Sequence, residues 1–308
     1  HNRTTMIQLK GLFANSKWYT KTALLIGIPL FFSILSSVIC VLVSSVMGID
    51  LQTVNTGGLL GIQAFQSILT FIGGGWLYAY LISKEPLRYL GLDSMKNPWL
   101  YVIATISMFT IIPLVNITAL WNDGIQLPAS LQALEEFMRS LENAANDITI
   151  KMMQGEGIGS TAIALVVMAL IPAIGEELLF RGGLQKGLEN KTGNAHLAVW
   201  VTAFVFSFIH FQFYGFIPRL ILGAALGYFY VYSKSLWIPI WAHFVNNATS
   251  VLSYKLLYQY SDETNLSTMG APTGLEHTIM VGLALFSLAT YIATMLIFVF
   301  VARDRKTQ

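Results

Sequence analysis

The chain has 308 residues, of which 55% are hydrophobic and 11% are charged, and its formal net charge is +2. Soluble globular proteins carry roughly 25% charged residues, so this composition excludes an ordinary soluble enzyme, a nucleic-acid-binding protein and a disordered regulator. The single cysteine, Cys40, excludes an internal disulfide framework and a zinc site built from cysteines. A chain with a mean hydropathy of +0.61 is expected to be a multi-pass membrane protein.

The apolar residues form runs that are long enough for about eight transmembrane helices, each of which needs roughly 20 residues. These runs lie near residues 22–47, 58–83, 98–120, 158–180, 197–217, 219–233, 236–256 and 278–302. They differ from the alternating segments of outer-membrane barrels. The sequence therefore predicts an all-α polytopic membrane protein with a single transmembrane domain over residues 1–308. Met6 is expected to be the natural start, which would make His1 to Thr5 additional residues, and the first run is too long for a signal peptide.

The basic residues predict the orientation of the helices, because cytoplasmic loops carry an excess of Lys and Arg. With the N-terminus in the cytoplasm, only four of the 18 basic residues lie on the outer side, namely Arg139, Lys151, Arg219 and Lys255. An even number of helices returns the chain to its starting side, and the residues after Val301 include three basic ones. We therefore expect both the N- and C-termini to be cytoplasmic.

The longest connection, about residues 121–157, is external in this topology. Its apolar residues recur at helical spacing, at Leu131, Leu134, Met138, Leu141 and Ala145. This pattern predicts an amphipathic helix that lies on the outer surface. Such a helix is a candidate lid or substrate platform; the alternative is a surface helix that only packs on the bundle.

Ionisable residues within the predicted helices are candidates for function, because each costs at least about 2.5–3.5 kcal/mol in a bilayer. Glu176, Glu177 and Arg181 follow the apolar run that ends at Ile174. Glu177 and Arg181 are four residues apart, so they share a helix face and can form an ion pair. Glu176 points elsewhere and has no local partner, which suits a carboxylate that accepts or donates a proton.

Two histidines lie within predicted helices, His210 near the end of one and His243 in another. Asn247 follows His243 by four residues and faces the same way. Each of these residues alone is as compatible with a hydrogen bond between neighbouring helices as with a functional role. Together with Glu176 they place four polar groups on neighbouring helical elements, and helix lengths at 1.5 Å per residue allow them to meet if the fourth helix is unusually long.

The pattern Glu-Glu-x-x-x-Arg, Phe-x-x-x-His and His-x-x-x-Asn resembles the CPBP family, which includes the CAAX prenyl endopeptidases and bacterial Abi-type membrane proteins. The three motifs begin here at Glu176, Phe206 and His243 and are intact and in the family's order. The resemblance covers about residues 158–250, which would form the catalytic core. It implies an eight-helix intramembrane endopeptidase, a hydrolase that cleaves a hydrophobic peptide or a membrane-protein substrate.

By this resemblance, Glu176 would activate the attacking water, with His210 helping to hold it. His243 and Asn247 would stabilise the oxyanion of the tetrahedral intermediate. Glu177 and Arg181 would be structural or orienting residues, and Phe206 would pack.

The cofactor is left open by the residues. Metal-free catalysis by glutamate is the expectation, because no pair of histidines has local chelating spacing. The alternative is a zinc ion held by Glu176, His210 and His243 with one open position.

Two other functions compete with the protease. One is a non-catalytic membrane scaffold or a bacteriocin-immunity-type protein, and the other is a proton-coupled transporter, although no inverted repeat is visible. In each case the expected partner is the lipid bilayer, no nucleic acid is expected, and the expected location is the cell membrane, as the plasma or inner membrane of a prokaryote.

Overall fold

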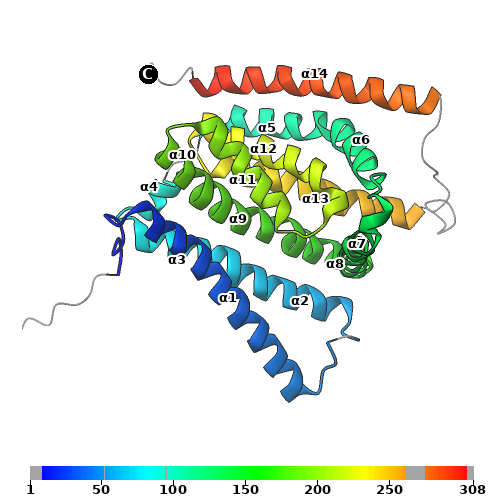
Figure 1. Cartoon of the computed structure of the whole chain (residues 1–308), viewed down its shortest axis with the longest axis horizontal. Coiled ribbons are helices and arrows are strands. Elements are labelled where there is room, and N and C mark those ends of the chain that lie inside the picture. Colours follow the sequence, from blue (N-terminus) through cyan, green and yellow to red (C-terminus); the bar gives the residue numbers. More distant parts are fainter. Residues whose placement is uncertain (1–8, 52, 94–95, 261–274, 304–308) are drawn as a thin grey trace, which may run out of the picture.

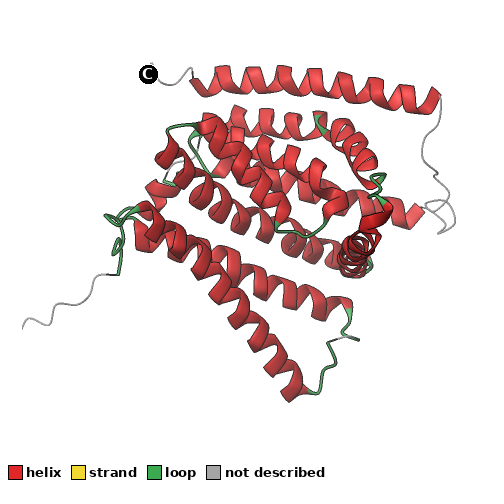
Figure 2. Ribbon diagram, viewed as in Figure 1, coloured by secondary structure: helices red, strands yellow, loops and turns green. Residues whose placement is uncertain are grey.

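The computed structural model describes residues 9–51, 53–93, 96–260 and 275–303, and within them it contains helices and loops without any strand (Figures 1 and 2). His1 to Thr5 lie outside the described residues. The α-helices are α1 (Trp18–Met47), α2 (Thr56–Ser67), α3 (Gly74–Ile82), α4 (Pro86–Leu90), α5 (Pro98–Thr110), α6 (Ile112–Asp123), α7 (Gln132–Met153), α8 (Gly157–Ala164), α9 (Ile171–Glu177), α10 (Lys186–Thr192), α11 (Ala195–Phe208), α12 (Phe216–Ser233), α13 (Trp237–Tyr260) and α14 (Leu275–Arg303).

Six helical stretches among the described residues are long and apolar enough to cross a membrane. They are Trp18–Met47, Thr56–Ile82, Pro98–Asp123, Gly157–Thr192, Phe213–Ser233 and Thr278–Arg303. The other two predicted ranges also hold helices, α11 with 14 residues and α13 with 24. The prediction of an all-α polytopic membrane protein is therefore confirmed. The count of eight spanning helices and the cytoplasmic position of both termini stay predictions.

The prediction that a helix continues over residues 197–217 is wrong. Helix α11 ends at Phe208, so His210 lies in the turn that follows it and not within a helix. Phe211 adopts a φ of 53°, a left-handed conformation that turns the chain toward α12. The apolar pattern runs on through this turn, so hydrophobicity alone could not place the end of the helix.

The centre of the bundle consists of α9, α11, α12 and α13. Helices α11 and α12 pack along each other, and α13 packs on α5 and α9. Helix α14 lies along α5 and α6 on one side of the bundle, while α1 packs on α3 at the opposite side (Figure 1). The outer helices expose many large apolar side chains, such as Phe31 and Phe286, as expected for surfaces in contact with lipid.

Gly75 allows α3 to approach the helix that carries Glu176, Glu177 and Arg181. A Cβ atom built on Gly75 would lie 2.8 Å from Leu178 Cβ and 3.4 Å from the Leu178 carbonyl carbon. Real Cβ atoms do not approach this closely, so any side chain at this position would push the two helices apart. Leu178 directly follows Glu177, and the contact therefore positions the acidic motif as well as stabilising the bundle.

Gly75→Ala is expected to lower the free energy of unfolding by about 1–3 kcal/mol, because it overpacks this contact. The matched control is Gly61→Ala, since Gly61 lies within α2 and a Cβ there would meet nothing within 4 Å. That change is expected to leave stability unchanged or to raise it by up to about 1 kcal/mol. Unfolding in detergent measures both variants, and equal stabilities for the two would contradict the close-packing argument.

The connection over residues 121–157 contains the predicted amphipathic helix, which is α7. Met138, Leu141 and Ala145 are half-buried on its packed side, as predicted. Leu131 and Leu134, which were assigned to the same face, are exposed. The external position of this segment stays a prediction.

Polar contacts explain why the packed side of α7 differs from the hydrophobic pattern. The Arg139 guanidinium lies 3.9 Å from the centre of the Tyr214 ring, and Arg139 Nε is 3.1 Å from Glu135 Oε1. The backbone N–H of Tyr214 donates to Glu142 Oε2 at 3.1 Å. Helix α7 is therefore held on the loop before α12 by charged side chains, which an apolar pattern cannot reveal.

Candidate active site

A single long helix carries the acidic motif. The stretch Gly157–Thr192 comprises 36 residues and includes α8, α9 and α10. Two π-helical segments, Leu165–Leu170 and Leu178–Gln185, flank the seven residues of α9. Wider π turns inside a helix frequently occur at functional sites, because they redirect the side chains that follow. The structure thus has the unusually long fourth helix that a shared site requires.

Glu177 and Arg181 form the predicted ion pair, and both side chains are fully buried. Arg181 Nη1 donates to Glu177 Oε1 at 2.6 Å, and Arg181 Nη2 donates to the carbonyl oxygen of Gly223 in α12 at 2.8 Å. The guanidinium also lies over the Phe206 ring of α11, 5.1 Å from its centre. This one cation therefore connects three helices of the bundle centre.

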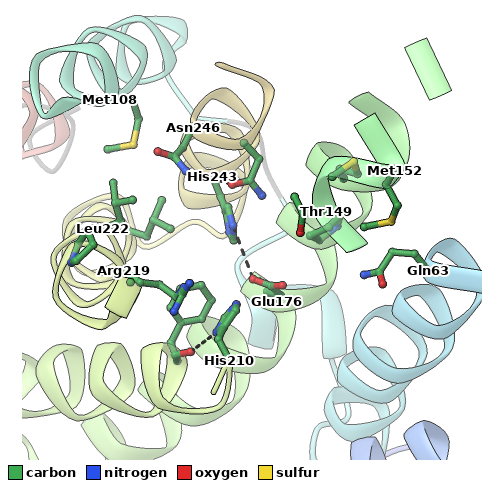
Figure 3. A pocket seen from close by; sticks show the side chains of 17 residues that line it. Gln63, Met108, Thr149, Met152, Glu176, His210, Arg219, Leu222, His243 and Asn246 are labelled. Carbon is green, nitrogen blue, oxygen red and sulfur yellow. Dashed lines mark hydrogen bonds and ion pairs between the residues drawn. The ribbon is translucent and has the colours of Figure 1, made fainter. Parts of the chain in front are cut away.

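His243, on α13, lies between the two glutamates of the motif. Its Nδ1–H donates to Glu177 Oε1 at 2.8 Å. Its Nε2 is 3.7 Å from Glu176 Oε2 (Figure 3). The carboxylate of Glu177 fixes the orientation of the imidazole, in the way that second-shell carboxylates fix histidines elsewhere. The buried pair thus directs His243 Nε2 toward Glu176.

His210 reaches the site from the turn after α11. Its Nδ1–H donates to the carbonyl oxygen of Phe206 at 2.7 Å, which leaves Nε2 available (Figure 3). The Phe206 ring stands edge-on to both imidazoles, with centroids 5.0 Å from His210 and 6.0 Å from His243. Phe206 packs between the two histidines and sets their separation.

Asn247 lies one helical turn beyond His243 on α13. Its Oδ1 accepts a hydrogen bond of 3.1 Å from Nδ2 of the neighbouring Asn246. Because the oxygen is occupied, the amide NH₂ of Asn247 is the group that remains free to donate. Sequence reasoning missed Asn246, whose only signal was its position next to a motif residue.

Glu176, His210, His243 and Asn247 all line one cavity of about 490 Å³, a volume typical of ligand sites (Figure 3). The apolar part of its wall includes Met108, Met152, Met168, Pro172, Leu222 and Leu226. Thr149 and Met152 bring α7 to the cavity, and Arg219 of α12 adds a cation. These residues were not predicted to belong to the site, because they come from elements that the motifs do not include.

The candidate zinc ligands Glu176, His210 and His243 all line the same cavity. Among the residues that the structure describes, no group of three His, Cys, Asp or Glu side chains is arranged to hold a metal ion. His210 directs Nδ1 to a carbonyl oxygen and His243 directs Nδ1 to Glu177, so Nε2 of each ring remains available, as it also does in histidines that bind a metal. Metal-free catalysis by Glu176 and a zinc ion held by Glu176, His210 and His243 therefore both stay predictions.

Comparison with known proteins places the motifs within a family segment. Residues 158–249 match the family described as type II CAAX prenyl endopeptidase Rce1-like. Over 88 residues the chain is 30% identical to the uncharacterized protein YpbD of Bacillus subtilis (strain 168), a match that covers 27% of this chain and 42% of that protein. No solved structure matches the chain. The chain therefore carries an Rce1-like segment at residues 158–249, which confirms its resemblance to the CPBP family of CAAX-type proteases.

Proposed function

We propose that this protein is an intramembrane endopeptidase that hydrolyses a peptide bond with a water molecule activated by Glu176. The observation that carries the proposal is the single cavity that brings Glu176 together with His210, His243 and Asn247. A carboxylate, two imidazoles and an amide are the groups that general acid–base hydrolysis of a peptide requires. The match of residues 158–249 to a protease family supports the same activity.

In the proposed reaction, the Glu176 carboxylate takes a proton from water while His210 Nε2 accepts a hydrogen bond from the same molecule. The water oxygen bonds to the carbonyl carbon, and the electron pair of the C=O bond moves to its oxygen. When the carbonyl re-forms, the C–N bond breaks, and Glu176 returns the proton to the leaving nitrogen. The reaction consumes one water and yields a carboxylic acid and an amine.

Asn247 Nδ2 and His243 Nε2 are the proposed donors to the oxyanion. For His243 this role requires the imidazolium form, with Nδ1–H on Glu177 and Nε2–H directed into the cavity. A preorganised donor of this kind is worth roughly 2.7–4 kcal/mol of transition-state stabilisation in other hydrolases. The Glu177–Arg181 pair acts through His243 as a positioning group.

The proposed substrate is a hydrophobic peptide or a segment of a membrane protein, since much of the cavity wall is apolar. The protein spans a membrane, and we propose the plasma or inner membrane of a prokaryote as its location, because the one relative named above is bacterial. Partners other than the substrate and the lipid bilayer are not part of the proposal.

Cleavage of a quenched hydrophobic peptide library by the purified protein in detergent tests the proposed function. We expect hydrolysis that a metal chelator leaves unchanged. Loss of activity with chelator and recovery with zinc would instead make Glu176, His210 and His243 metal ligands. Absence of cleavage across the library would contradict the protease and favour a membrane scaffold or a proton-coupled transporter.

A further inference from the structure

Arg219 is a cation in the wall of the candidate active site that the proposed mechanism does not use. It lies in the first turn of α12 and lines the same cavity as Glu176, beside His210 (Figure 3). Arg219 Nη1 donates to the carbonyl oxygen of Gln212 at 3.3 Å, and Nη2 donates to Gln212 Oε1 at 2.8 Å. Both acceptors are neutral, so the positive charge of Arg219 is not balanced by its hydrogen-bond partners.

No carboxylate lies within 4.0 Å of the Arg219 guanidinium among the described residues. Arg139 and Arg181, in contrast, each contact a glutamate. The acidic residues that interact electrostatically with Arg219 are Glu142 and Glu176. Glu142 accepts a hydrogen bond from the Tyr214 N–H, and Glu176 Oε2 lies 3.7 Å from His243 Nε2. The half-buried guanidinium of Arg219 is therefore able to bind an anion that comes from outside the protein.

Gly215 keeps the guanidinium open on the side of α7. A Cβ atom built on Gly215 would lie 3.1 Å from Arg219 Nη2 and 3.7 Å from Glu142 Oε1, and Gly215 itself lines the cavity. A side chain at this position would fill the space between the two charges. The absence of one leaves the edge of Arg219 accessible from the cavity.

We propose that Arg219 binds a carboxylate of the peptide substrate and thereby selects peptides with an acidic group close to the bond that is cleaved. The planar guanidinium presents paired donors that match a carboxylate. The carboxylate belongs either to the C-terminus of the peptide or to an Asp or Glu side chain. This inference rests on the proposed protease function, since it names what that site recognises.

Three matched hydrophobic peptides test the proposal: one with a free C-terminal acid, one with a C-terminal amide, and one amide with a Glu near its end. We expect the wild-type protein to favour an acidic peptide over the plain amide by about 10- to 100-fold in kcat/KM, mostly through KM. In Arg219→Gln this preference is expected to disappear, so that the ratio of kcat/KM for the acidic peptide to kcat/KM for the plain amide falls to about one. The acidic peptide that loses its advantage identifies the source of the carboxylate.

Control variants separate recognition from a structural role. Gln212→Ala removes a hydrogen bond of Arg219 but keeps the cation. Arg88→Gln removes an exposed cation that does not line the cavity. Both variants should retain the preference for acidic peptides. An Arg219→Gln variant that lowers kcat for all three peptides alike would show that Arg219 only holds the loop, and would overturn the proposal.

Binding of the same peptides to Glu176→Gln, followed by fluorescence anisotropy, keeps the inference separate from the proposed function. Peptides that bind with a preference dependent on Arg219 but are not cleaved by the wild type would refute the protease and support the recognition site. Peptides that are cleaved without any preference would refute the recognition site and support the protease.

Discussion

Glu176→Gln is expected to reduce peptide hydrolysis by about 10²- to 10⁴-fold in kcat, because the amide cannot accept the proton of the attacking water. The side chain keeps its shape and volume, so the cavity and the binding of substrate should change little. Glu176 does not belong to the Glu177–Arg181 pair, and its closest described partner is His243 Nε2 at 3.7 Å. The free energy of unfolding is therefore expected to fall by less than about 1 kcal/mol. Initial rates of peptide cleavage and unfolding in detergent measure the two quantities on the same preparations.

Glu136→Gln is the matched control for this variant. Glu136 is exposed on α7 and accepts a hydrogen bond from Gln132, so the same change of charge there leaves the cavity untouched. Its kcat should equal that of the wild type. A Glu176→Gln variant that retains full activity would exclude Glu176 as the proton acceptor, whatever the effect of the control.

The motif spacing predicted those parts of the site that depend on a single helix. Glu177 and Arg181 are four residues apart, and an α-helix brings such residues onto one face, so their ion pair followed from the sequence. The unusual length of the helix that carries them was only a condition for a shared site, since the apolar run predicted a span over residues 158–180. The helix over Gly157–Thr192 meets that condition.

Contacts between distant segments could not be predicted in this way. Glu177 contacts His243, 66 residues later, and Arg181 contacts Gly223, 42 residues later. Sequence spacing carries no information about which nitrogen of His243 faces which carboxylate. The motifs supported a shared site, while its hydrogen-bond arrangement depends on how α9, α12 and α13 pack.

The turn after α11 shows a second limit of the sequence pattern. His210 was assigned to a helix because Phe208, Ile209 and Phe211 continue the apolar run. The left-handed conformation of Phe211 is rare for a residue with a large side chain, so composition favoured a helix there. Arg219 was assigned to the outer side of the membrane by its position at the start of a predicted helix, which could not reveal that it lines the cavity.

We expect the largest loss of stability when the buried network of Glu177, Arg181 and His243 is broken. Arg181→Met removes the cation but leaves Glu177 fully buried, with His243 Nδ1–H as a remaining donor and the Gly223 carbonyl without its partner. Removing one partner of a buried ion pair costs about 3–5 kcal/mol, because the other charge stays uncompensated. Unfolding in detergent should show a loss of this size for Arg181→Met. A loss below about 1 kcal/mol would contradict this account of the buried ion pair.

The double variant Glu177→Leu with Arg181→Met distinguishes stability from catalysis. Replacing both charges with apolar side chains removes the uncompensated carboxylate, so most of the lost stability should return. Activity should not return, because His243 then lacks the acceptor that orients its Nδ1–H and directs Nε2 toward Glu176. Recovery of both properties would show that Glu177 serves only to balance Arg181. Recovery of stability without activity would establish that the buried carboxylate positions the imidazole for the reaction.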